Sequence, residues 1–166
     1  MNRYSLQYTT PFPGTSVGFM EFSPNGRFLI VGDGTRDRLY VLDRVTGFRP
    51  VIETGTISSP TSLTFESSTS FFVGLSDGRF VEYKVDLRSK YLVKGWTNDA
   101  LHGGFPVTAM TLDATVRVLA LAVGPGVFVF NRVARTGAWI LFCWVSGGNS
   151  AHFRPIRVCS EYFQPV

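Results

Sequence analysis

The chain has 166 residues, which suits one domain. Hydrophobic residues make up 45% of it and charged residues 17%, so the composition is that of a globular protein and excludes a disordered chain. The formal net charge is +4, but the Lys and Arg residues are scattered, so we do not expect a nucleic-acid partner. The longest wholly apolar run, residues 138–145, is much shorter than the roughly 20 residues of a membrane-spanning helix, so we expect no membrane partner.

Cysteine usage and the N-terminal residues bear on the cellular compartment. The two cysteines, Cys143 and Cys159, do not make a disulfide framework, and the chain has no CxxC motif. Residues 1–7 lack the apolar core of a signal peptide. These observations predict an intracellular protein, either cytoplasmic or nuclear.

Short strand-like runs separated by tight turns follow one another from the N-terminus. Residues 3–9 alternate large apolar and polar side chains, which predicts a strand. Residues 16–54 then hold three runs rich in β-branched and aromatic residues, and a fourth run that contains Pro50. Because proline cannot donate a backbone hydrogen bond, the fourth run is expected at the edge of a sheet. Together the runs predict an antiparallel meander, with strands at residues 17–22, 28–31, 39–42 and 48–53.

The same order of runs and turns occurs twice more, in residues 60–96 and 106–145. The first runs of the three units end at Phe22, Phe65 and Leu112, which lie 43 and 47 residues apart. These intervals are close to the about 40–45 residues of a four-stranded repeat. The sequence therefore predicts an all-β fold of three four-stranded antiparallel units.

Several short motifs give the repeats a family resemblance. The FSPNGR segment at residues 22–27 resembles the FSPDGR turn of WD-repeat β-propellers, and residues 41–47 resemble the VWD…TG ending of that repeat. HGGFPV at residues 102–107 and HFRPIRV at residues 152–158 resemble the GH-x-x-P-V/I start of an inner strand. The resemblance implies a partial β-propeller of about three blades plus a terminal strand at each end. Residues 152–166 would begin a fourth blade, and residues 3–9 would form a ring-closing outer strand.

The motifs depart from the WD pattern at the positions that carry its hydrogen bonds. Leu42, Tyr83 and Phe130 occupy the place of the repeat's Trp, so the His–Ser–Asp–Trp hydrogen-bond tetrad is incomplete in every repeat. The blades are expected to depend on apolar packing between sheets instead, mainly by their innermost and middle strands. The predicted core consists of Phe22, Leu29, Val31, Val41, Leu63, Phe65, Val73, Val81, Met110, Leu112, Leu119, Leu121, Phe128 and Phe130.

The sequence predicts no catalytic, cofactor or metal site. The GLSDG segment at residues 74–78 matches the G-x-S-x-G nucleophile elbow, which requires a strand before it and a helix after it. The residues that follow alternate like a strand, so a hairpin turn is the preferred interpretation. His102 and His152, the two histidines, have no zinc-ligand spacing, and the glycines around Asp33 lack the third glycine of a dinucleotide loop.

The resemblance to WD-repeat propellers implies a non-catalytic scaffold that binds other proteins. Loops on a rigid scaffold usually carry binding, whereas blade edges are occupied by strand pairing. Self-association through open blade faces is also expected, since three blades do not close a ring. The alternatives are a small serine hydrolase using the turn at Gly74, Ser76 and Gly78, and a truncated fragment with no function of its own. The candidate partner-binding residues are Arg36, Asp37, Asp77, Arg79, Asn98, Asp99 and His102.

Overall fold

The chain folds into β-strands joined by short turns. The computed structural model describes residues 13–14, 16–115 and 117–146, and within them the helical elements are two 3-10 turns, η1 (Arg44–Thr46) and η2 (His102–Gly104). No helix in these residues is long and apolar enough to cross a membrane. The strands are β1 (Val17–Phe22), β2 (Phe28–Asp33), β3 (Arg38–Asp43), β4 (Arg49–Gly55), β5 (Pro60–Phe65), β6 (Ser70–Leu75), β7 (Phe80–Asp86), β8 (Tyr91–Thr97), β9 (Val107–Asp113), β10 (Val118–Val123), β11 (Gly126–Arg132) and β12 (Trp139–Ser146).

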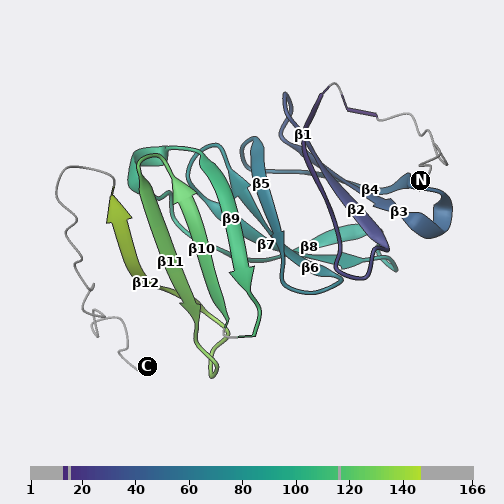
Figure 1. The fold of residues 1–166 in the computed structure, drawn as a ribbon. Helices are drawn as coiled ribbons and strands as arrows, with labels where there is room; N and C mark the ends of the chain where they lie inside the picture. The colour runs from purple at the N-terminus through teal and green to yellow at the C-terminus, as the bar shows by residue number, and fades with distance from the viewer. Residues whose placement is uncertain (1–12, 15, 116, 147–166) are drawn as a thin grey trace, which may run out of the picture.

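These strands form three four-stranded antiparallel sheets that stand side by side, with the second between the first and the third (Figure 1). Strand order follows the chain in each sheet: β1 to β4 in the first, β5 to β8 in the second and β9 to β12 in the third. The predicted all-β class and the meander order are therefore confirmed. The predicted terminal strands, at residues 3–9 and within 152–166, lie outside the described residues.

The turn at residues 23–26 shows why the strands reverse where they do. The Ser23 hydroxyl accepts a hydrogen bond from the backbone N–H of Phe28 at 2.9 Å, and the backbone N–H of Ser23 donates to the carbonyl of Phe28 at 2.8 Å. These two bonds close the turn. Gly26 has φ of 68°, a left-handed conformation that costs glycine little. The neighbouring Arg27 guanidinium pairs with the buried Asp43 carboxylate at 3.1 Å, which links the turn to the end of β3.

Alternating residues of the middle strands form the core between the sheets. On β6, one side of the strand contacts the first sheet, and Phe72 on the other side contacts the third sheet. A third, smaller cluster of Val31, Tyr40 and Leu42 is buried on the face of the first sheet that points away from the second. The buried residues between the first and second sheets are Phe28, Ile30, Leu39, Val41, Ile52, Leu63, Phe71, Val73, Leu75, Val81, Tyr83, Val85 and Leu92. Those between the second and third are Phe72, Phe80, Val107, Leu119, Leu121, Val123, Phe128, Phe130 and Trp139.

An ion-pair group reinforces the contact between the second and third sheets. Arg132, at the end of β11, pairs with Glu66 and also with Glu82, the latter at 3.7 Å. Its Nε donates to the carbonyl of Gly137 at 3.1 Å, and its guanidinium carbon lies 5.7 Å from the centre of the Trp139 ring. Since Glu66 and Glu82 belong to the second sheet's part of the chain, Arg132 joins two sheets by charge as well as by packing.

The innermost strands contribute less to the core than the sequence predicts. Phe22 on β1 is 54% exposed, and Phe65, Met110 and Leu112 on β5 and β9 are only half-buried. An innermost strand has a neighbouring strand on one side only, so part of each side chain borders open space. Leu29 is half-buried as well, while the other nine predicted core residues are buried.

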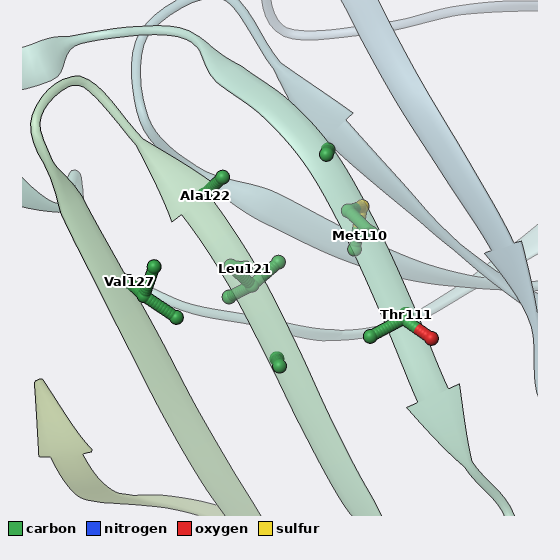
Figure 2. A pocket seen from close by; sticks show the side chains of 7 residues that line it. Met110, Thr111, Leu121, Ala122 and Val127 are labelled. Atoms are coloured by element: carbon green, nitrogen blue, oxygen red, sulfur yellow. The ribbon is translucent and has the colours of Figure 1, made fainter.

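The face of the third sheet that points away from the second sheet is open. Ala109 on β9 and Ala120 and Ala122 on β10 form the floor of a shallow apolar pocket, beside Val127 of β11 (Figure 2). Val127 is 47% exposed, and Phe142 on β12 is 60% exposed. Apolar surface of this kind is more typical of a contact region than of a solvated face.

Candidate functional site

Five connections lie at one end of the sheets, and the first four of them form the candidate site; the fifth is the short β10–β11 turn, residues 124–125. In an antiparallel meander every second connection emerges at the same end. Residues 34–37, 56–59, 76–79 and 98–106 are the first four of these connections, and together we call them the loop face. Each of the seven candidate partner-binding residues lies in it.

The turn between β6 and β7 is held by one carboxylate. Asp77 accepts hydrogen bonds from the backbone N–H of Arg79 at 3.2 Å and from its Nε at 2.8 Å, and it forms an ion pair with the same guanidinium. Partial burial by itself would raise the pKa of Asp77, but the hydrogen bonds and charge of Arg79 hold that pKa below its ordinary value of 3.8. The pair is therefore charged at neutral pH, and it orients the guanidinium along the turn.

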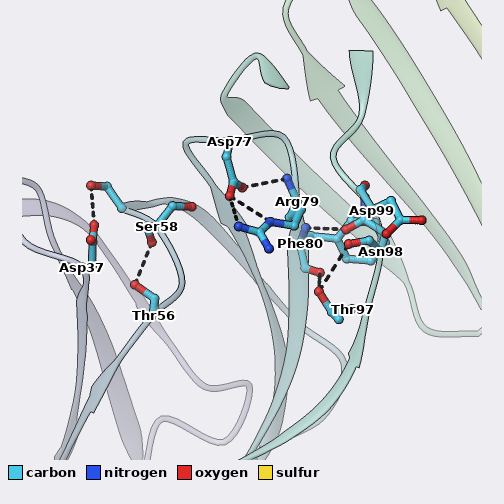
Figure 3. A network of polar contacts seen from close by, with 10 residues as sticks. Asp37, Thr56, Ser58, Asp77, Arg79, Phe80, Thr97, Asn98 and Asp99 are labelled. Atoms are coloured by element: carbon cyan, nitrogen blue, oxygen red, sulfur yellow. Dashed lines mark hydrogen bonds and ion pairs between the residues drawn. The ribbon is translucent and has the colours of Figure 1, made fainter. Parts of the chain in front are cut away.

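The long connection between β8 and β9 folds back over that turn (Figure 3). The side-chain oxygen of Asn98 accepts from the backbone N–H of Phe80 at 2.6 Å, and the N–H of Leu101 donates to the carbonyl of Gly78 at 3.1 Å. Gly78 has φ of 82°, and a Cβ on it would lie 2.7 Å from the Leu101 carbonyl oxygen. Only glycine fits this position without displacing the connection.

The first sheet's loop joins the same face through the connection between β4 and β5. The Ser59 hydroxyl donates to the Asp37 carboxylate at 2.7 Å, and the Thr56 N–H donates to the Asp37 carbonyl at 2.8 Å. The N–H of Ser76 then donates to the Ser59 carbonyl at 2.8 Å, which links this connection to the β6–β7 turn. One chain of hydrogen bonds therefore crosses the loop face from the first sheet to the connection that leads into the third.

The structure brings some of the predicted residues together. Asp77, Arg79 and Asn98 lie next to one another, while Asp37 is connected to them only through Ser59 and Ser76. Asp99 is exposed beside Asn98: its carbonyl accepts from the Asn98 side chain, and its charge adds to the hydrogen bond and charge of Asp77 that raise the pKa of Arg79. Arg36, which is exposed, and His102 lie in the same connections.

Sequence reasoning missed two exposed apolar side chains and one buried carboxylate. Ile57 is 46% exposed and Phe105 is 52% exposed, both within the loop face. For Ile57, a large apolar residue in an otherwise polar connection is the signal that would have found it. Asp33 is buried at the end of β2, where its carboxylate accepts from the N–H and hydroxyl of Thr35 at 2.9 Å and 3.0 Å. It shapes the loop rather than facing a ligand.

Ser76 stands in a hairpin turn between two strands. The N–H of Leu75 donates to the carbonyl of Arg79 at 2.9 Å, and β7 begins directly afterwards, where a nucleophile elbow would have a helix. The part of the chain that the structure describes contains no group of three or more His, Cys, Asp or Glu residues able to hold a metal ion.

No protein-family model matches the chain, and no curated protein sequence matches it either. Solved structures do match. A crystal structure of the mitotic checkpoint complex matches with a TM-score of 0.53 and 17% identity, over 63% of this chain and 32% of that chain. The periplasmic gluconolactonase PpgL of Pseudomonas aeruginosa matches with a TM-score of 0.63 and 21% identity, over 78% and 40%. A functionally unknown protein from Desulfotomaculum acetoxidans matches with a TM-score of 0.66 and 13% identity, over 83% and 44%.

These matches define the class of fold. The checkpoint and gluconolactonase matches are propeller proteins, so the chain has a propeller-like all-β fold whose three sheets correspond to blades. The matched part spans less than half the length of each of these proteins. The gluconolactonase is an enzyme by its name, but sequence identities this low show a shared fold and do not show a shared function.

Proposed function

We propose that the chain is a non-catalytic, WD-repeat-like scaffold that binds another protein through its loop face. The observation that carries the proposal is the hydrogen-bonded continuity of the loop face, from Asp37 through Ser59 and Ser76 to Gly78 and Leu101. Loops fixed to one another in this way lose little further conformational freedom when a partner binds.

The exposed side chains of the loop face are of the types that protein interfaces use. Ile57 offers apolar contact area that solvent now covers, and Arg36, in the first connection, offers an exposed guanidinium. Interfaces combine apolar or aromatic anchors with Arg at their centre and polar groups around them. Asp37, Asp77 and Asp99 supply polar groups of opposite charge, which favour a partner surface of mixed charge.

Site-specific photo-crosslinking in cells tests the proposal. A photo-reactive amino acid replaces Ile57 in the full chain, and the same replacement is made at Val45 and Val93. Val45 is exposed on η1 at the opposite end of the sheets, and Val93 is exposed on the outer strand β8. We expect a protein adduct from position 57, and none from 45 or 93. Adducts from 45 or 93 with none from 57 would contradict the proposal.

Affinity measurements with the captured protein then separate contact from misfolding. We expect Ile57→Asp to weaken its binding about tenfold or more, since a charge at an interface anchor is poorly tolerated. Val45→Asp is the matched control, because it places the same charge on an exposed β-branched residue away from the loop face, and it should leave the Kd unchanged. Equal losses in the two variants would count against the loop face.

A serine hydrolase using Ser76 is the second candidate. It is favoured by the position of the 98–106 connection, which contains His102 and lies against the turn that contains Ser76. Hydrolysis of a chromogenic ester by the purified chain tests it. Activity that Ser76→Ala abolishes would support the hydrolase over the scaffold, whereas activity that survives this change would exclude Ser76 as the nucleophile.

A further inference from the structure

The first residue of the third sheet packs into a small socket on the second sheet, and polar side chains border this socket. Val107, the first residue of β9, follows Pro106, and its carbonyl accepts from the Thr61 hydroxyl at 2.6 Å and from the Ser62 hydroxyl at 2.9 Å. A Cβ on Gly74 would lie 2.7 Å from the Cβ of Val107, so the valine side chain sits directly on that glycine. Thr61, Ser62 and Gly74 together hold the start of the next sheet.

The third sheet repeats this socket on its open face. Ser62 is paired with Gly74 between β5 and β6, and Ala109 is paired with Ala122 at the same register between β9 and β10. The Thr61 hydroxyl also lies 3.1 Å from the carbonyl of Gly74; likewise the Thr108 hydroxyl donates to the carbonyl of Ala122 at 3.3 Å.

Thr108, Ala109 and Ala122 therefore stand where Thr61, Ser62 and Gly74 stand in the second sheet. We call these three residues the third-sheet socket. Thr108 and Ala109 are exposed, and Ala109 and Ala122 line the apolar pocket of Figure 2. The part of the third sheet that corresponds to the seat of Val107 is thus open, and the side chains around it are small. Ala122 has a Cβ where Gly74 has none, so a branched side chain seated there lies farther from the sheet than Val107 does.

The chain beyond β12 has the length and residue order to reach this socket. Nine residues, 98–106, separate β8 from β9; they end in proline and contain His102. Nine residues, 147–155, likewise follow β12; they also end in proline and contain His152. Ile156 comes next, in the sequence position that corresponds to Val107.

We propose that the third-sheet socket is the docking site of the chain's own C-terminal segment, residues 156–163, with Ile156 seated on Ala122. The two existing sheet-to-sheet contacts support this docking, since β5 packs on the first sheet and β9 packs on the second in the same way. The floor of the socket is apolar and uncharged, which suits Ile156 better than the arginine that follows it.

Hydrogen exchange of the full-length chain tests the proposal. Docking should protect backbone amides of residues 156–163 at least about tenfold relative to a peptide of the same sequence, because docked amides exchange only on local opening. Ala122→Arg fills the socket with a long charged side chain, and Ile156→Asp removes the apolar residue that enters it. Both variants should lose the protection.

Controls separate docking from general stability. Val93→Arg places the same charge on an exposed position of β8 and should leave the protection intact. Protection within β6 should be unchanged in all variants, which shows that the sheets remain folded; if Ala122→Arg unfolds them, Ile156→Asp decides the outcome. Exchange of residues 156–163 at the rate of the peptide, or protection insensitive to both variants, would overturn the proposal. Protection that is lost on dilution to the monomer would overturn it too, because the occupant would then be a second copy.

Discussion

At the scale of single residues, the contact between the second and third sheets depends on a few aromatic side chains. The Phe72 ring lies edge-on to Trp139, with centroids 5.3 Å apart, and to Phe80 at 6.1 Å. Phe72 is fully buried, so its removal leaves a cavity that both sheets border. Phe22 is the contrasting case, because it is also aromatic and on a strand but mostly exposed.

We therefore expect Phe72→Ala to lower the free energy of unfolding by about 3–5 kcal/mol, the usual loss for a buried aromatic. Phe22→Ala should cost about 1 kcal/mol, since it loses mainly its edge-to-face contact with Phe48. Urea unfolding followed by tryptophan fluorescence measures both. Similar losses in the two variants would mean that the two side chains are not buried as differently as described.

At the scale of strands and turns, one glycine sets how closely two sheets approach. Gly74 on β6 faces the start of β9, and a Cβ there would collide with Val107 and with the Ser62 hydroxyl. The strands are close because Thr61 and Ser62 bond the Val107 carbonyl across the sheets. A larger residue at this position forces β9 outward and breaks those bonds.

Gly74→Ala should therefore destabilise the fold by about 1–3 kcal/mol, the range for overpacking. Gly55→Ala is the matched control at the end of β4, where a Cβ would lie 3.8 Å from the nearest atom, the Asp37 carbonyl oxygen, an ordinary contact. Thermal unfolding of the two variants gives the comparison. A Gly74→Ala protein as stable as Gly55→Ala would show that β9 adjusts without cost.

At the scale of the whole molecule, the three blade-like sheets of the described residues do not close a ring. Propellers close a ring with about 4–8 four-stranded blades, and the chain matches less than half of each of its structural neighbours. Ile140 and Phe142 on β12 expose apolar side chains on the open face of the third sheet, outside the socket. A segment docked on β9 and β10 would not cover the outer strand of that sheet.

We expect the purified chain to self-associate through this outer strand. Light scattering should give a mass above the 18.4 kDa of one chain that rises with concentration, and Phe142→Asp should lower it. Tyr91→Asp, on the exposed outer strand of the second sheet, is the control and should leave the association unchanged. A stable monomer with cooperative unfolding would contradict this expectation.

Local patterns in the sequence were sufficient to predict the strands, their antiparallel order and the loops that hold the candidate residues. Alternation of β-branched residues and turn chemistry such as that of Ser23 and Gly26 act over a few residues, so they can be read without knowing the fold. The repeat length added the number of sheets, because each repeat supplies one meander.

Burial and the joining of the loops depended on tertiary packing. Phe22 and Phe72 look alike in sequence, yet only Phe72 has a sheet on its side of the strand. The exposure of Ile57 and Phe105 and the link from Asp37 to the β6–β7 turn depend on how far one sheet stands from the next. That spacing is set by contacts between residues about 45 apart, such as Ser62 with Val107, and no local pattern encodes them.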